Sequence, residues 1–502
     1  MKITAERARL DSLLSKARAK ASSDGRAVLV SFTEAGSFID PLTALDSLSR
    51  ASGADPKLAA IVREGRVYWN RSSDGFAFAG AGAALTLAPK GTKRFAEADA
   101  EWSELLRRAI IESSIDPGLE PHPRPGPIAA GGFAFESEDP VTTEWSSFAA
   151  ANLIVPRLLV TSAEGASWVT LSAVVSGDDD IEGISEGWLK LLSSVQDESS
   201  APGIFDAGTS ATTESERMPS EGWSGVVAEA VREIHRGRID KVVLARAVQV
   251  SAGRDIDAFA MLRHLIAAHR DVFVFAYWRG PTVFLGATPE RLVRLEGRLV
   301  EASSLAGTAK RDRDPEIDRA IASDLLASTK DRFEHSLVRY AIVAALDAVC
   351  EDVVAPESPS LLTLPHVHHL HTEIRGLLRP GHSILDLVER LHPTPAVGGS
   401  PRHASLEFIR EKENLDRGWY AGPIGWVGQN GGEFAVALRS ALITGSSATL
   451  FAGCGIVADS DPDLELAESR LKLQPMQAAI AAALGNAAEL PGTTDSRLAA
   501  RG

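Results

Sequence analysis

Strand-like segments recur along much of this chain, mixed with helices, and this order constrains the fold more than any other feature. The first half contains such runs at 26–32, 67–69, 76–79 and 153–161. The second half contains longer ones, at 241–250, 272–278, 282–287, 298–303, 435–444 and 448–452. Runs of strands that are mixed with helices and joined by short turns are typical of α+β proteins rather than of strict βαβ alternation. We therefore predict an α+β fold.

Helices and connections divide the chain further. Amphipathic periodicity predicts helices at 223–236, 257–268, 314–328, 331–350, 384–391, 405–416 and 464–484. A segment rich in Ser, Thr, Pro and acidic residues predicts an exposed linker at 206–221, and 486–502 is expected to be a flexible tail. This leaves an N-terminal half, 1–205, and a C-terminal region, 222–485.

The overall composition limits the kinds of partner. The formal net charge of −15 argues against nucleic acid or an anionic membrane, because either requires a basic surface. No apolar run approaches the roughly 20 residues that cross a bilayer, and the first residues lack the apolar core of a signal peptide. Two cysteines, Cys350 and Cys454, are too few for a disulfide framework and fit a reducing cytoplasm.

Residues 391–401, Leu-His-Pro-Thr-Pro-Ala-Val-Gly-Gly-Ser-Pro, form a rigid, loop-like segment. Alone, such a turn only joins two elements. Other short motifs flank it in order, at 241–246, 286–290, 305–308, 334–335, 369–370, 417–425 and 453–456. This ordered set, over about 220–482, resembles the chorismate-utilising enzymes and, in its His-Pro-Thr-Pro-Ala, their isochorismate synthase branch. The resemblance implies an anthranilate-synthase-like fold of large antiparallel sheets flanked by helices, with two similar halves that share one large antiparallel sheet.

Lys241 and Glu290 are the candidates for acid–base chemistry. Lys241 opens an apolar strand, where a lysine usually extends its amine to water. Glu290 follows a Thr-Pro turn, where a glutamate is most often a first-turn helix acid. The resemblance implies instead that Lys241 is the base that activates water and that Glu290 is the acid that protonates the departing hydroxyl. Both groups would then have to change protonation near neutral pH.

Two pairs of acidic residues suggest a cation site. Asp331 and Glu334 lie three residues apart in one predicted helix, and Glu465 and Glu468 lie three apart in another. This spacing places each pair on one helix face, which is also common on solvated surfaces. Two such faces meeting would suit a hard cation. The resemblance implies that Glu334 and Glu468, with Asp331 and Glu465, bind Mg²⁺.

Cationic and small residues are candidates for binding an anionic substrate, chorismate by the resemblance. Arg439 lies among apolar residues of the strand predicted at 435–444, and a buried arginine requires an anion. The resemblance makes that anion the enolpyruvyl carboxylate, with a hydrogen bond from Tyr420, and Lys472 a counter-charge to the metal site. Backbone and side-chain contacts to the substrate are expected from Gly307, Thr308, His369, Ala396, Gly453 and Gly455.

Three positions separate the branches of the family. Lyase-type and aminating relatives usually carry Thr where this chain has Ala396, ammonia users generally lack Lys241, and aminating enzymes favour Lys where Arg402 follows Pro401. We therefore expect an isochorismate synthase, of menaquinone type because the N-terminal half is long, without a glutaminase subunit and as a monomer or weak homodimer. Alternatives are a salicylate synthase or other chorismate lyase-type enzyme, an isochorismate synthase of siderophore biosynthesis, and an inactive binding homologue.

Overall fold

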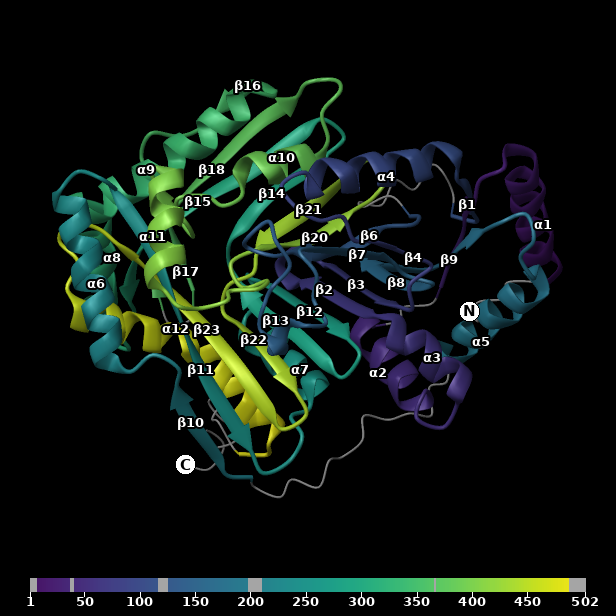
Figure 1. Cartoon of the computed structure of the whole chain (residues 1–502), viewed down its shortest axis with the longest axis horizontal. Helices are drawn as coiled ribbons and strands as arrows, with labels where there is room; N and C mark the ends of the chain where they lie inside the picture. Colours follow the sequence, from purple (N-terminus) through teal and green to yellow (C-terminus); the bar gives the residue numbers. More distant parts are fainter. Residues whose placement is uncertain (1–6, 37–39, 116–124, 197–209, 365–366, 487–502) are drawn as a thin grey trace, which may run out of the picture.

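The computed structural model describes residues 7–36, 40–115, 125–196, 210–364 and 367–486. Their strands form two sheets that pack face to face between layers of helices (Figure 1). The predicted α+β class with large antiparallel sheets is confirmed, with one parallel pair, β1 and β5. No helix in the described part of the chain combines the length and apolar composition that crossing a membrane requires.

The large sheet has 13 strands. In spatial order they are β10 (Thr212–Glu216), β11 (Lys241–Ala252), β23 (Ser447–Ile456), β22 (Ser440–Thr444), β13 (Thr282–Thr288), β12 (Phe273–Arg279), β2 (Arg66–Arg71), β3 (Phe76–Ala81), β8 (Leu158–Ala163), β9 (Ala166–Val175), β1 (Val28–Ala35) and β5 (Ile110–Ser113), with the short β19 (Gly399–Ser400) beside β11.

The small sheet has 10 strands. Their order is β16 (Cys350–Val354), β18 (Val367–Leu378), β15 (Leu299–Lys310), β14 (Arg291–Glu296), β21 (Gly431–Val436), β20 (Pro423–Val427), β6 (Ala129–Phe133), β7 (Ala151–Val155) and β4 (Leu85–Leu87), with β17 (Ser360–Thr363) beside β18.

Both sheets have a two-fold strand order. Outward from the central β12–β2 pair of the large sheet, β13, β22, β23 and β11 correspond to β3, β8, β9 and β1. Outward from the β20–β6 pair of the small sheet, β21 and β14 correspond to β7 and β4. The chain therefore consists of two similar halves, as expected, but they share two sheets rather than one. In Figure 1 the first half runs from purple to blue and the second from teal to yellow.

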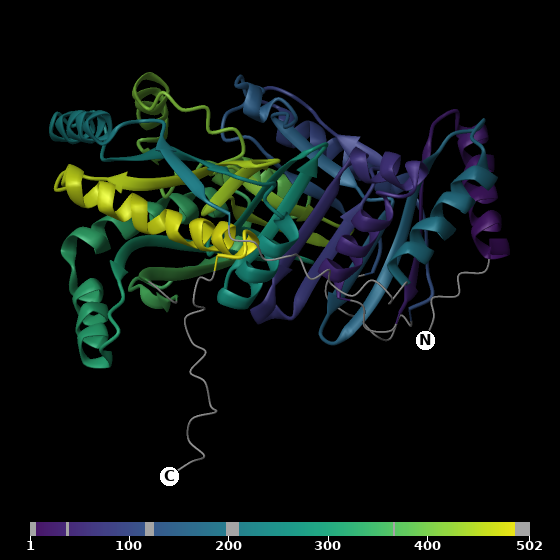
Figure 2. The same cartoon turned by 90° about the horizontal axis from the view of Figure 1, so that it is seen from below.

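Helices cover the outer faces of the sheets. The large sheet is covered by α1 (Arg7–Asp24), α2 (Pro41–Ala51), α3 (Pro56–Glu64), α5 (Ile181–Gln196), α7 (Ala258–Ala268) and α12 (Pro462–Ala483), the last drawn in yellow in Figure 2. The small sheet carries α4 (Arg94–Arg108), α9 (Thr329–Asp347) and α10 (Ile384–Leu391), while α8 (Pro315–Ala327) packs beside α9. The helices α6 (Ser220–His235) and α11 (Arg402–Lys412) pack near β11.

Alternating side chains of the strands build two separate cores. In β12, Phe273, Phe275 and Tyr277 belong to the core between the sheets. The residues between them, Val274, Ala276 and Trp278, belong to the core beneath the helices of the large sheet. Successive residues of a strand point to opposite faces, so a strand that is covered on both sides is apolar throughout. This explains the continuous apolar runs from which the strands were predicted.

Two predicted strands are wrong, because each is a pair of strands in different sheets. The run 153–161 is split between β7 in the small sheet and β8 in the large sheet, at Pro156, which has no N–H for a ladder. The run 435–444 is split between β21 and β22, at residues 437–439. Apart from Arg157 and Arg439, apolar composition continues through both breaks, since residues on both sides are buried.

The predicted linker is partly structured. Residues 212–216 form β10, which is exposed but pairs with β11, and α6 begins at Ser220. Of the predicted tail, only Asn486 is described, and its side chain donates to the Ser210 carbonyl over 2.9 Å. Residues 206–209 and 487–502 lie outside the described part of the chain.

Close packing of the two halves depends on Gly418. This residue has a φ of 51°, and a Cβ there would lie 2.2 Å from the indole ring of the fully buried Trp145 in the other half. Gly418→Ala should therefore lower the free energy of unfolding by about 2–5 kcal/mol, from left-handed strain plus overpacking. Urea unfolding followed by tryptophan fluorescence measures this loss.

Gly237→Ala is the matched control, since Gly237 has a φ of 72° and open space around its Cβ position. It should cost only the strain, about 1–2 kcal/mol. Equal losses in the two variants would show that contact with Trp145 adds nothing.

Candidate active site

A cavity of about 320 Å³ lies where the chain crosses from one sheet to the other. One crossing joins β13 to β14 through Pro289 and Glu290, and the other joins β21 to β22 through Leu438 and Arg439. The crossings are bonded to each other, because the Val436 N–H donates to the Glu290 carbonyl and the Ala287 N–H donates to the Arg439 carbonyl (3.0 and 3.1 Å). Their relative position is therefore fixed by the backbone.

The structure brings every predicted site residue to this cavity. Its lining includes Lys241, Glu290, Gly307, Thr308, Asp331, Glu334, His369, Ala396, Tyr420, Arg439, Gly453, Gly455, Glu465, Glu468 and Lys472. These residues come from both sheets, from α9 and α12, and from the loop before β19. Their convergence shows one site; the role of each residue stays a prediction.

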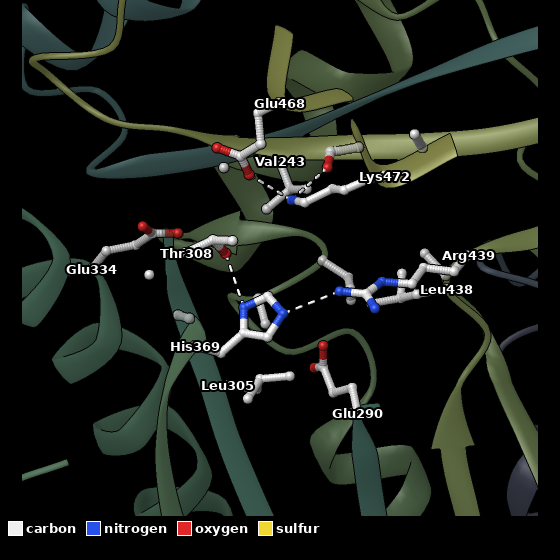
Figure 3. A pocket seen from close by; sticks show the side chains of 18 of the residues that line it. Val243, Glu290, Leu305, Thr308, Glu334, His369, Leu438, Arg439, Glu468 and Lys472 are labelled. Carbon is white, nitrogen blue, oxygen red and sulfur yellow. Dashed lines mark hydrogen bonds and ion pairs between the residues drawn. The ribbon is translucent and has the colours of Figure 1, made fainter. Parts of the chain in front are cut away.

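Arg439 is not mid-strand, as the sequence predicted, but in the crossing, with a left-handed φ of 45°. Its Nη2 lies 3.1 Å from Nε2 of His369, and Nδ1 of His369 lies 2.9 Å from Oγ1 of Thr308 (Figure 3). Arginine can only donate, so Nε2 accepts and Nδ1 carries the proton that it donates to Thr308. Burial lowers the pKa of His369 well below its usual value, which agrees with this neutral tautomer.

Arg439 is a partly buried cation without an acidic partner. No carboxylate of the described residues forms an ion pair with it, and burial lowers its guanidinium pKa to about 10. A partly desolvated cation in this condition favours the binding of an anion. Tyr420, whose ring stacks on Phe451, lines the same cavity.

Lys241 is 1% exposed, and its Nζ lies 2.8 Å from Oε1 of Glu334. The strand β23 can pass beside this ion pair because residue 455 is glycine. A Cβ at Gly455 would lie 2.7 Å from the Glu334 carboxylate and 2.9 Å from Cε of Lys241. The glycine therefore leaves the space in which the two charges meet.

Four carboxylates face the cavity from two helices, Asp331 and Glu334 from α9 and Glu465 and Glu468 from α12. Lys472 forms a 2.6 Å ion pair with Glu468 and also donates to the Gly453 carbonyl. Burial, followed by the charge of Glu468, raises the pKa of Glu465 to about 7. Negative charge is thus incompletely neutralised on this side of the cavity.

This donor set fits a hard divalent cation. Ligand atoms of Glu465, Glu468 and Cys454 lie within 4.8 Å of one another. Burial raises the pKa of the Cys454 thiol, which donates to the Glu465 carbonyl, so the available donors are oxygens. Oxygen ligands suit Mg²⁺. The Asp331 carboxylate accepts from the Ser328 hydroxyl at the start of α9 and is held there.

Glu290 is 4% exposed, and burial raises its pKa to about 7, although Lys241 and Lys472 act in the opposite direction. The carboxyl therefore keeps its proton near neutral pH. This is the property that a general acid requires, and the direction agrees with the sequence prediction.

Several cavity residues were not predicted from the sequence. Lys330 is an exposed lysine in the first turn of α9, and Arg417 belongs to a motif but had no assigned role. Val243, Leu305, Val397 and Leu464 supply apolar wall. A surface lysine and scattered apolar residues carry no local signal for a site, because only the fold brings them to the cavity.

Comparisons with known proteins show the family of the chain. The sequence profile of a family described as chorismate binding enzyme matches residues 14–481. Isochorismate synthase MenF of Bacillus subtilis is 35% identical over 92% of this chain and 95% of its own length. Salicylate biosynthesis isochorismate synthase of Pseudomonas aeruginosa is 39% identical over 85% of this chain and 86% of its own.

A solved structure shows the same fold. The menaquinone-specific isochorismate synthase MenF from Escherichia coli superposes with a TM-score of 0.72 over 94% of this chain and 99% of its own, at 24% identity. The fold expected from the sequence motifs is therefore confirmed.

Burial of Glu290 should reduce stability at high pH. The folded protein keeps the proton up to about pH 7, whereas the unfolded chain releases it near 4.5. The contribution of this carboxyl to the free energy of unfolding is therefore fully present below pH 4.5 and is lost as pH rises through 7. Relative to the parent protein, Glu290→Gln should gain on the order of 3 kcal/mol of unfolding free energy between pH 4.5 and pH 8.5.

Urea unfolding at several pH values, with chelator present, measures this difference. Glu407→Gln, at an exposed position of α11, is the control and should show a constant difference. A constant difference for Glu290→Gln as well would contradict the raised pKa.

Proposed function

The chain belongs to the chorismate binding enzyme family, and from this we propose that it is an isochorismate synthase, which converts chorismate reversibly into isochorismate. The observation that carries the proposal is that one cavity holds both a buried lysine and a buried carboxyl, whose pKa burial raises to about 7. Such a pair can activate water and protonate a leaving hydroxyl in one displacement.

Lys241 and Glu290 have complementary parts in this reaction. The Lys241 amine takes a proton from water as the water oxygen bonds to carbon 2 of the ring. The bond from carbon 4 to its hydroxyl breaks, both double bonds of the ring shift by one position around the other side of the ring, and the departing hydroxide takes the proton of Glu290. Water is added and water is lost, so substrate and product are isomers and the reaction is reversible.

The cations of the cavity orient the dianionic substrate. Arg439 lacks an acidic partner among the described residues and therefore suits the enolpyruvyl carboxylate, with Tyr420 as a further donor. His369, which accepts from Arg439 and donates to Thr308, keeps the guanidinium in place. Orientation of this kind can supply several kcal/mol of a rate enhancement.

Mg²⁺ is the metal we assign to the four carboxylates, because they offer a cluster of oxygen donors with excess negative charge. When bound, the cation would neutralise these carboxylates and provide a positive site for the ring carboxylate. The chain itself contributes Glu334 and Glu468, each already ion-paired with a lysine, Lys241 and Lys472.

The purified protein, incubated with chorismate and Mg²⁺ in the absence of ammonia, should form isochorismate that is free of salicylate and pyruvate. Chromatography of the products, with and without chelator, measures this. Lys241→Ala should lower the turnover by at least about 10²-fold, because the proton acceptor is lost.

Three further results decide between the alternatives. Glu468→Gln should raise the Mg²⁺ concentration needed for half-maximal turnover, while the exposed Glu407→Gln should leave it unchanged.

Formation of salicylate together with pyruvate would place the protein in the lyase branch. Unconverted chorismate with folded protein would contradict catalysis and favour a binding role.

We assign the product to menaquinone biosynthesis. The Bacillus subtilis relative named MenF aligns with this chain over 95% of its own length and 92% of this chain, so the alignment includes the long N-terminal half of this chain. Deletion of the gene should abolish menaquinone, measured by mass spectrometry of lipid extracts, and this chain should restore it. Another relative is named for salicylate biosynthesis, so loss of a different product is the alternative outcome. Normal menaquinone with loss of salicylate or of a catechol siderophore would contradict the assignment.

A further inference from the structure

The strand that carries Lys241 has an incomplete edge. Along one side, β11 pairs with β23 from Val242 to Ser251. On the other side, β19 pairs only with Lys241 and Val242, and β10 pairs only with residues 248–252. Backbone groups between these two stretches face a gap in the sheet, and buried groups of this kind require partners.

Side chains of α11 and the residues after it fill this gap. The Ser405 hydroxyl donates to the Lys241 carbonyl over 2.9 Å. Nη2 of Arg417 donates to the Val243 carbonyl, and Oε2 of Glu413 accepts from the Ala245 N–H, both over 2.8 Å. Lys241 still pairs with β19, whereas Val243 and Ala245 lie beyond it, so at these two residues side chains bind where a neighbouring strand would otherwise pair.

Glu413 and Arg417 are also bound to each other. Nε and Nη2 of Arg417 lie 2.6 and 2.5 Å from the two carboxylate oxygens of Glu413. Both residues are almost fully buried, at 2% and 4% exposed. Pairing with Glu413 raises the pKa of Arg417 against the effect of burial, so the guanidinium stays charged.

The pair connects β11 to the loop at 392–401. Nη1 of Arg417 donates to the Val397 carbonyl over 2.9 Å, one residue after Ala396, and the Val243 N–H donates to the Gly398 carbonyl. The guanidinium also lies over the ring of Phe135, 4.3 Å from its centroid, in the first half of the chain. One side chain thus contacts the strand of Lys241, the loop of Ala396 and the other half of the molecule.

A buried ion pair is a costly way to gain stability, because desolvation offsets most of the attraction. An apolar pair would fill the same space but would leave the Val243 carbonyl and the Ala245 N–H without partners. The planar guanidinium of an arginine, paired with a carboxylate, can bind the Val243 carbonyl and the Ala245 N–H at fixed angles. The chemistry of the pair therefore matches a requirement for geometry rather than for stability.

We propose that Glu413 and Arg417 are positioning residues, which hold the strand of Lys241 in register with the Ala396 loop across the cavity. The inference rests on the proposed function, since it is the placement of the Lys241 amine relative to bound chorismate that the pair would fix. Val243 lies two positions after Lys241, so both side chains are on the same face of β11.

Arg417→Lys tests this assignment. The substitution keeps the charge but cannot reproduce the fork, so the tethers to Val243, Val397 and Glu413 cannot all be kept. At 15 °C, with folding checked by near-ultraviolet circular dichroism, we expect kcat to fall about 10²-fold while KM for chorismate changes less than about threefold. A purely structural role would lower the folded fraction without this separation of kcat from KM.

Arg157→Lys is the matched control. Arg157 forms the same two-pronged contact with Glu64, and Oε2 of Glu64 accepts from the Ala83 N–H, but the pair lies in the first half and does not line the cavity. This variant should lose stability and keep kcat. Unchanged kcat in Arg417→Lys, or an equal fall in Arg157→Lys, would overturn the proposal.

Glu413→Gln provides a second test that keeps the shape of the side chain and an acceptor for the Ala245 N–H. It should also lower kcat more than it changes KM, and full turnover in this folded variant would overturn the proposal. The parent protein is assayed alongside: if it forms no isochorismate, the proposed function fails, whereas an active parent with fully active variants refutes only the positioning role.

Discussion

The site depends on the two places where the chain leaves one sheet and enters the other. A strand cannot continue there, so the backbone turns and exposes side chains between the sheets instead of burying them in a core. Glu290 stands in one crossing and Arg439 in the other, and backbone hydrogen bonds join the two crossings directly. A proton donor and an anion-binding group therefore have a fixed separation before any ligand arrives. Preorganisation of this kind removes the entropic cost of ordering flexible loops when a ligand binds.

Three of the cations that line the cavity are held in ion pairs. Lys241 faces Glu334, Lys472 faces Glu468, and Arg417 faces Glu413. Among the described residues only hydrogen bonds, and no ion pair, hold Arg439. With a net charge of −15 the chain would repel a dianion at long range, so attraction has to be local. A partly buried guanidinium without an ion pair on one side and carboxylates suited to a cation on the other provide that attraction at two separate points.

The sequence predicted the elements and the residues of the site better than it predicted how the chain connects them. Continuous apolar runs identified β12 and β13 closely, and collinear motifs identified side chains that converge on one cavity. The runs 153–161 and 435–444 were wrongly taken as single strands, because a crossing between two covered sheets stays apolar on both sides. Glu413 and Arg417 gave no signal of their contact with β11, because a pair that replaces a missing strand can be seen only once the edge of the sheet is known.

The two-fold strand order raises the question of why only one half holds a site. In the first half, Arg157 directly precedes β8, as Arg439 directly precedes β22 in the second. Both carboxylate oxygens of Glu64 accept hydrogen bonds from the guanidinium of Arg157. The guanidinium of Arg439 instead donates to the neutral His369. The crossing that corresponds to Glu290 consists of residues 82–84, Gly-Ala-Ala, which have no proton to donate from a side chain. In the first half, the carboxylate of Glu64 thus takes the position beside the arginine. In the second half, an anionic substrate would take the corresponding position beside Arg439. The first half can then serve as a wall and a brace, through Trp145 and Phe135, for the half in which the arginine stays available.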